Sequence, residues 1–148
     1  MIINFQGRHW KGEVPMEKVK ETLFSKGNFN CDIRSLQLDH RIPFCISQDD
    51  SLSNLQLLTP RQHKLKSGLD RRITHQLRKK GMIESVTHYS IELKVPKEEA
   101  IQEYKKWWSI IVQERWQEFI DSGLNKLYPE EPLPISTNLR IPTFNDSS

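Results

Sequence analysis

Cysteine and long apolar runs are scarce in this chain. The two cysteines, Cys31 and Cys45, are too few for a four-cysteine zinc site or a disulfide framework. No apolar run approaches the ~18–20 residues of a membrane-spanning helix, and Arg8 and His9 prevent a secretory apolar stretch near the start. We therefore expect a cytoplasmic protein with free thiols, no signal peptide and no membrane partner.

The length and composition fit one small soluble unit. A chain of 148 residues can form one compact domain, or a small catalytic core with accessory elements, and it is too short for a large multi-lobed enzyme. Hydrophobic residues make up 36% and charged residues 28%, which is enough apolar side chain to close a modest core.

Basic residues are concentrated in one segment. The formal net charge is only +3, but between Thr59 and Gly81 the only acidic residue is Asp70. An ordinary solvated helix surface would place acidic partners at i,i+4 spacing from the basic residues, and apart from Asp70 this segment has none. The segment therefore predicts a face that binds a polyanion. Its basic residues are Arg61, Lys64, Lys66, Arg71, Arg72, Arg78, Lys79 and Lys80.

The first third of the chain is predicted to hold one helix and one short strand. Residues 1–13 are expected to be irregular, and Pro15 is expected to open a helix over 16–26. A short strand is predicted at 36–39. The polar stretch 46–53 is expected to form a surface loop.

A second strand and the basic helix follow. Residues 54–58 are predicted to form a strand antiparallel to the first. Thr59 and Pro60 give a strong helix start, an N-cap hydroxyl followed by proline at the first helical position. Gly68 is expected to kink or divide this helix, with a second segment over 69–80.

The remaining part of the chain is predicted to contain a strand, a long helix and a tail. Alternating apolar and polar residues over 82–95 indicate a strand. Apolar and Trp residues recur at helical spacing over 97–127, which is more typical of a core-facing helix than of a base-stacking surface. Four prolines after Tyr128 predict an extended or disordered tail.

Four polar residues stand in an ordered pattern across the two strands and the basic helix. Asp39 and His40 lead into an Ile-Pro step, Asn54 follows that histidine by fourteen residues and begins an Asn-Leu-x-x-Leu step, and His63 follows Asn54 by nine. In this order the segment resembles the HNH endonuclease family, over roughly residues 31–68, about a quarter of the chain. The resemblance implies a strand, loop, strand and helix around one metal ion.

The resemblance also implies a role for each of these residues. Asp39 and His63 would be the protein ligands of one divalent ion. His40 would be the general base that activates water, and Asn54 would brace the loop that carries His40. Basic residues near this site are the candidate DNA contacts, namely Arg41, Arg61, Lys64, Lys66, Arg71 and Arg72.

The expected metal ion is Mg²⁺, with Mn²⁺, Ni²⁺ or Zn²⁺ as alternatives. Two protein ligands leave positions open for water and phosphate, and the oxygen ligand suits hard cations. Many family members also hold a structural zinc ion with two Cys-x-x-Cys pairs. Here Thr59 and Gln62 occupy the downstream positions and only Cys31 falls near the upstream ones, so no structural zinc ion is expected.

The expected fold is α+β, a ββα-metal core with flanking helices that include a long Trp-rich amphipathic helix. We expect an N-terminal helical arm at 1–30, the nuclease core with its basic helix at 31–80, an accessory strand and long helix at 81–128, and a tail at 129–148. Flanking helices would support a core that lacks zinc.

The expected function is metal-dependent hydrolysis of phosphodiester bonds in double-stranded DNA, by a monomer or homodimer. The alternative is a non-catalytic nucleic-acid-binding module that retains the fold. Charge alone does not exclude an RNA substrate, and the sequence gives no indication of base specificity.

Overall fold

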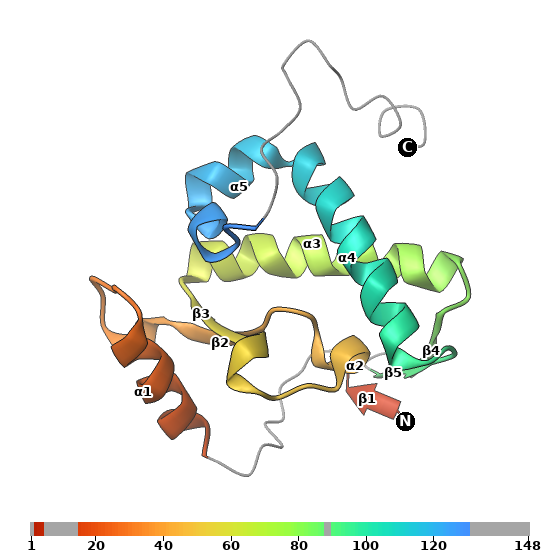
Figure 1. Ribbon diagram of the computed structural model, residues 1–148, viewed down its shortest axis with the longest axis horizontal. Coiled ribbons are helices and arrows are strands. Elements are labelled where there is room, and N and C mark those ends of the chain that lie inside the picture. Colours follow the sequence, from red (N-terminus) through yellow and green to blue (C-terminus); the bar gives the residue numbers. More distant parts are fainter. Residues whose placement is uncertain (1, 5–14, 88–89, 131–148) are drawn as a thin grey trace.

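The computed structural model describes residues 2–4, 15–87 and 90–130 of the chain (Figure 1). Helices and strands are mixed in an α+β fold, as the sequence predicted. The strands are β1 (Ile2–Asn4), β2 (Gln37–His40), β3 (Leu55–Leu58), β4 (Ile83–Thr87) and β5 (Ser90–Leu93). The α-helices are α1 (Met16–Lys26), α2 (Phe44–Ser47), α3 (Pro60–Lys79), α4 (Lys97–Glu114) and α5 (Trp116–Ser122), and the 3₁₀ helices are η1 (Ile33–Ser35), η2 (Leu52–Asn54) and η3 (Leu124–Leu127).

The predicted pair of strands and the helix after them are confirmed. β2 and β3 are antiparallel, with Asp39 opposite Gln56. α3 begins directly after β3 with a capping box, in which the Thr59 hydroxyl accepts from the Gln62 backbone N–H at 3.2 Å and Gln62 Oε1 accepts from the Thr59 backbone N–H at 3.0 Å. This cap fixes where the basic helix starts relative to β3.

α3 is continuous, so the predicted kink or division at Gly68 is wrong. Gly68 instead permits the Arg115 guanidinium to approach the helix backbone closely, because a Cβ atom built at Gly68 would lie 3.2 Å from Arg115 Nη1. α3 also carries a buried apolar stripe at helical spacing. This stripe consists of Leu65, Leu69, Ile73 and Leu77.

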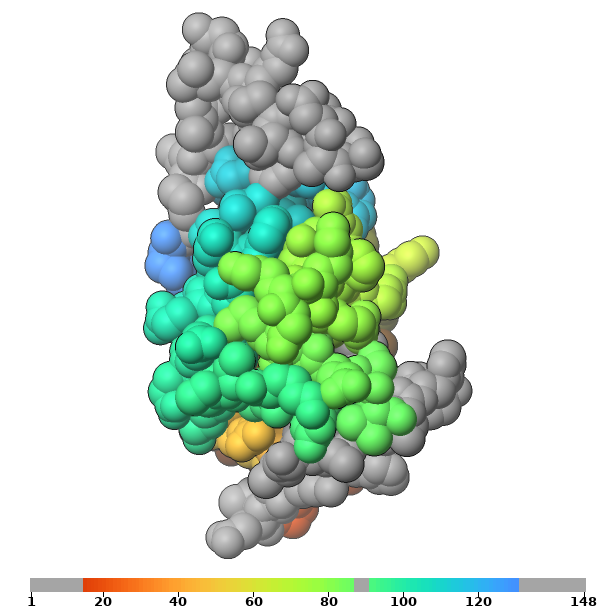
Figure 2. Space-filling model, turned by 90° about the vertical axis from the view of Figure 1, so that its right-hand side faces the viewer, coloured from red at the N-terminus to blue at the C-terminus, as the bar shows by residue number. Residues whose placement is uncertain are grey.

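The Trp-rich segment packs across α3, as Figures 1 and 2 show. Trp108 is only 5% exposed and belongs to the central core, which confirms that this stripe is core-facing. The predicted single helix over 97–127 is wrong in length. α4 ends at Glu114, Arg115 leaves helical geometry with φ −120° and ψ 35°, and α5 and η3 then fold back toward the start of α3.

The strand predicted over 82–95 is in fact a hairpin of β4 and β5. β5 lies in the middle of a three-stranded antiparallel sheet, between β4 and β1. Ile3 of β1 lies opposite Ile91 of β5, so the expectation of an irregular 1–13 is wrong for Ile2–Asn4. The rest of that segment, residues 1 and 5–13, is outside the described residues.

The loop between β2 and β3 is more structured than expected. The predicted polar loop over 46–53 starts inside α2, where Cys45 and Ile46 are buried. Both cysteines are free, as predicted, and Cys31 is exposed. The predicted tail falls mostly on 131–148, outside the described residues. In the described ranges, no helix is long and apolar enough to cross a membrane.

Replacing Thr59 with alanine is expected to lower the free energy of unfolding by about 1 kcal/mol, because the N-cap hydrogen bond is lost. Thr59→Ser keeps the hydroxyl and should lose much less. Urea denaturation of the three proteins measures both changes. Equal losses in the two variants would show that the hydroxyl does not stabilise α3.

Candidate functional site

Asp39 and His40 end β2 and face different parts of the molecule. Successive side chains of a strand point to opposite faces. Asp39 points toward α3, where its Oδ2 lies 3.2 Å from Lys66 Nζ and accepts from Gln56 Nε2 at 2.9 Å. His40 Nε2 lies 2.7 Å from Oδ1 of Asp50, in the loop after α2. The two side chains are therefore held by separate sets of contacts.

His63 lies on the same side of α3 as the residue that contacts Asp39. His63 precedes Lys66 by three residues, and side chains at this spacing are neighbours on a helix, with Cβ atoms ~5–6 Å apart. His63 is half-buried. The face of α3 that meets Asp39 thus also carries the other predicted metal ligand. Among the described residues there is no cluster of three or more His, Cys, Asp or Glu side chains placed to hold a metal ion.

Asn54 is 6% exposed and ties together the loop between the strands. Its Oδ1 accepts from the backbone N–H of Ile42 at 3.0 Å. Its Nδ2 donates to the carbonyl oxygens of Ile42 at 3.0 Å and Asp49 at 2.9 Å, and to Ser47 Oγ at 3.2 Å. These contacts lock the segment that leaves His40 and the segment that leads to its partner Asp50. The Asn54 side chain therefore braces this loop.

Lys66 is completely buried, which removes it from the predicted DNA contacts. Its Nζ donates to the backbone carbonyl of His40 at 3.0 Å and to Asp70 Oδ2 at 2.7 Å, besides its ion pair with Asp39. Burial alone would lower the pKa of Lys66, but the carboxylates of Asp39 and Asp70 outweigh it and hold that pKa above its usual value. Lys66 is therefore a charged internal link between α3 and β2.

The buried cluster around Lys66 has more negative than positive charge. One ammonium faces two carboxylates, Asp39 and Asp70. Asp70 also accepts from the Tyr104 hydroxyl at 2.5 Å. Burial raises the pKa of Asp70 to about 6, against the lowering effect of the Lys66 ammonium, and the Asp39 charge adds to the rise. A cation beside Asp39 would balance the excess negative charge.

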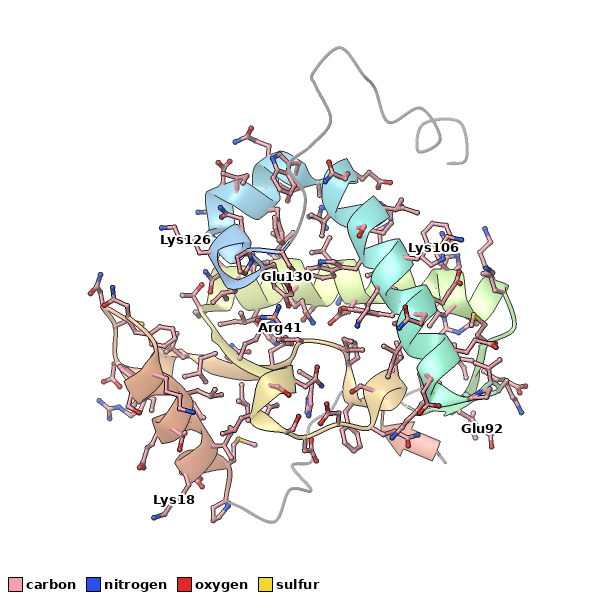
Figure 3. The ribbon with its side chains drawn as sticks, viewed as in Figure 1. Lys18, Arg41, Glu92, Lys106, Lys126 and Glu130 are labelled. Atoms are coloured by element: carbon pink, nitrogen blue, oxygen red, sulfur yellow. The ribbon has the colours of Figure 1, made fainter. Side chains whose placement is uncertain are left out.

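Arg41 makes intramolecular contacts that compete with its predicted role on DNA. Its guanidinium stacks 4.2 Å from the centre of the Tyr128 ring, donates to the Leu127 carbonyl at 2.7 Å and pairs with Glu130 at 2.8 Å. Figure 3 shows Arg41 and Glu130 side by side near the centre of the molecule. The Tyr128 hydroxyl also accepts from Gln56 Nε2 at 2.6 Å. Because Gln56 Nε2 donates to Asp39 as well, Tyr128 supports Asp39 through Gln56.

The basic surface of α3 is smaller than the sequence predicted. Arg61, Lys64 and Arg71 are exposed. Arg72, however, forms an ion pair with Glu114 of α4. Lys80, just beyond α3, pairs with Glu103 of α4 at 2.8 Å, so the acidic partners missing at local spacing come from another helix.

A pocket of about 410 Å³ lies between the loop and α4 rather than at the predicted metal ligands. Asn54 and Asp49 line it on one side, and Lys97 and Lys105 on the other. Asp39, His40 and His63 are not among its lining residues. Of the four predicted site residues, Asn54 alone lines this pocket.

Sequence reasoning missed the residues that position the four predicted ones. Asp50 is the main omission, since it lies in a stretch expected to be only a polar surface loop. Gln56 and Tyr128 were missed because their contact joins distant parts of the chain. The i,i+4 spacing of Lys66 and Asp70 was a usable signal for a helix face that pairs internally.

Comparisons of the chain with protein-family models, with curated proteins and with solved structures found no match. The site is therefore interpreted from its own geometry and from the residue pattern.

The raised pKa of Asp70 predicts a specific pH dependence of stability. A carboxyl group whose pKa is higher in the folded than in the unfolded state favours folding at low pH, and this contribution is lost as the pH rises through about 6. From about pH 5 to about pH 7.5, the wild-type protein should lose about 1 kcal/mol relative to Asp70→Asn. Urea denaturation at both pH values measures this difference, and a constant difference would contradict the raised pKa.

Proposed function

We propose that this chain is an HNH-type endonuclease that hydrolyses phosphodiester bonds of double-stranded DNA with one divalent metal ion. The observation that carries the proposal is the β2, loop, β3, α3 unit. It brings Asp39 and His40 to one strand end and turns the His63-bearing face of α3 toward Asp39. This arrangement supports a site at the junction of β2 and α3.

Asp39 and His63 would hold the metal ion. Lys66 and Gln56 occupy Oδ2 of Asp39, so Oδ1 is the oxygen suited to a metal. The excess negative charge of the Lys66 cluster also favours a cation there. One carboxylate oxygen and one imidazole suit Mg²⁺, and also Mn²⁺, Ni²⁺ or Zn²⁺. When bound, such an ion would polarise the phosphate and stabilise the leaving oxygen.

His40 would accept the proton of the attacking water. Because Asp39 and His40 point away from each other on β2, the imidazole does not compete with the carboxylate for the same position. Asn54 would act only through the loop that it braces, since its side-chain amide bonds to Ile42, Ser47 and Asp49. The exposed Arg61, Lys64 and Arg71 would bind phosphates next to the site.

The alternative is a nucleic-acid-binding module without activity. It is favoured by the finding that the described part of the chain contains no three-residue metal cluster. The proposed endonuclease needs only two protein ligands for its metal ion. The number of ligands therefore does not distinguish the two functions, and a cleavage assay does.

Metal-dependent cleavage of plasmid DNA tests the proposal. Wild-type protein should nick or cut the plasmid with Mg²⁺ or Mn²⁺ and lose this activity in EDTA. His40→Ala should reduce the cleavage rate by roughly 10²–10⁴-fold, because the general base is removed. Gel analysis of the plasmid forms measures both effects.

His75→Ala is the matched control, since His75 is an exposed histidine on the same helix. It should cleave at the wild-type rate. DNA binding without cleavage under any metal condition would favour the binding module, and cleavage of RNA but not DNA would change the substrate. Undiminished cleavage by His40→Ala would exclude His40 as the base.

A further inference from the structure

We propose that Asp50 is a positioning residue that fixes the orientation and tautomer of the His40 imidazole. Its role in cleavage rests on the proposed endonuclease function. The pairing itself does not, because it is an interaction within the protein. Asp50 stands outside the Asp39, His40, Asn54 and His63 pattern.

The contact between the two side chains is short and partly shielded from solvent. His40 Nε2 and Asp50 Oδ1 are 2.7 Å apart, and their side chains are 18% and 26% exposed. A hydrogen bond to a carboxylate at this distance is charge-assisted, and such bonds are roughly twice as strong as neutral ones. The Phe44 ring also packs near the imidazole, with ring centres 5.5 Å apart. Asp50 and Phe44 therefore both restrict the movement of the ring.

The loop that carries Asp50 is held in one conformation. Asn54 Nδ2 donates to the carbonyl of Asp49 at 2.9 Å, and the Asp49 carboxylate accepts from the backbone N–H of Ser51 at 2.8 Å. Gln48 adopts a left-handed conformation with φ 53° at the end of α2. A residue other than glycine takes this conformation only where its surroundings enforce it. These contacts thus hold the backbone that places Asp50 beside His40.

The pairing determines which ring nitrogen can act as a base. An ionised carboxylate only accepts hydrogen bonds, so the proton of the neutral imidazole lies on Nε2 and the lone pair on Nδ1. In the proposed reaction Nδ1 takes the proton of water, while the Nε2 proton stays in place. The Asp50 carboxylate then stabilises the imidazolium that forms. Asp50 itself makes and breaks no bond.

Nuclear magnetic resonance of ¹⁵N-labelled protein tests the pairing without metal or DNA. With the imidazole neutral, the wild-type spectrum should show a downfield proton bonded to Nε2 of His40 and protected from exchange with water. Asp50→Ala should lose this signal, and Asp50→Asn should shift it upfield because a neutral acceptor is weaker. Asp49→Asn is the control and should keep the signal, because the asparagine Oδ1 can still accept the hydrogen bond from Ser51 that holds the loop.

Kinetics of the same variants separate positioning from metal binding. Asp50→Ala should lower kcat by roughly 10–100-fold, as is typical for partners that orient a functional histidine, and Asp50→Asn by less. The dissociation constant for Mn²⁺, measured by calorimetry, should not change. A large loss of Mn²⁺ affinity would contradict the proposal, because Asp50 would then act at the metal.

The spectrum overturns the pairing if the wild-type His40 proton lies on Nδ1, or if Asp50→Ala retains the protected Nε2 signal. Wild-type protein that shows the signal but cleaves no nucleic acid would support the pairing and contradict the endonuclease function. The two failures are therefore distinguishable.

Discussion

The arrangement of this protein depends on the buried ammonium group of Lys66. It pairs with Asp39 at the end of β2 and with Asp70 on its own helix, and it donates to the carbonyl of His40. A buried charge is tolerated only with partners, and removing one partner of a buried pair typically costs about 3–5 kcal/mol. α3 and β2 are therefore joined at the point where the two proposed catalytic neighbours lie.

Two separate supports hold the proposed site, one on each side of β2. On the α3 side, Lys66 and Gln56 fix one oxygen of Asp39 and leave the other for a cation. On the loop side, Asn54 fixes the backbone that presents Asp50 to His40. In the proposed endonuclease, the side chains for metal binding and for proton transfer are thus positioned by different contacts, and Lys66 links the two through the His40 carbonyl.

Local patterns predicted the elements that adjacent residues determine. Thr59, Pro60 and the apolar run before them were sufficient for β3 and the start of α3. Long-range packing determined the rest. Gly68 does not break α3, and in the fold it lies close to Arg115, which stands between α4 and α5. Lys66 was predicted to be a DNA contact because sequence shows its charge but not its burial. Asp50 was missed because only the folded loop brings it to His40.

The most direct test of this account is the binding of Mn²⁺ to wild-type protein, followed by pulsed electron paramagnetic resonance. The account predicts one bound ion with coupling to an imidazole nitrogen, which disappears in His63→Gln but persists in His75→Gln, and weaker binding in Asp39→Asn. Mn²⁺ that binds with the same affinity and the same nitrogen coupling in His63→Gln and Asp39→Asn would contradict a metal site at the junction of β2 and α3.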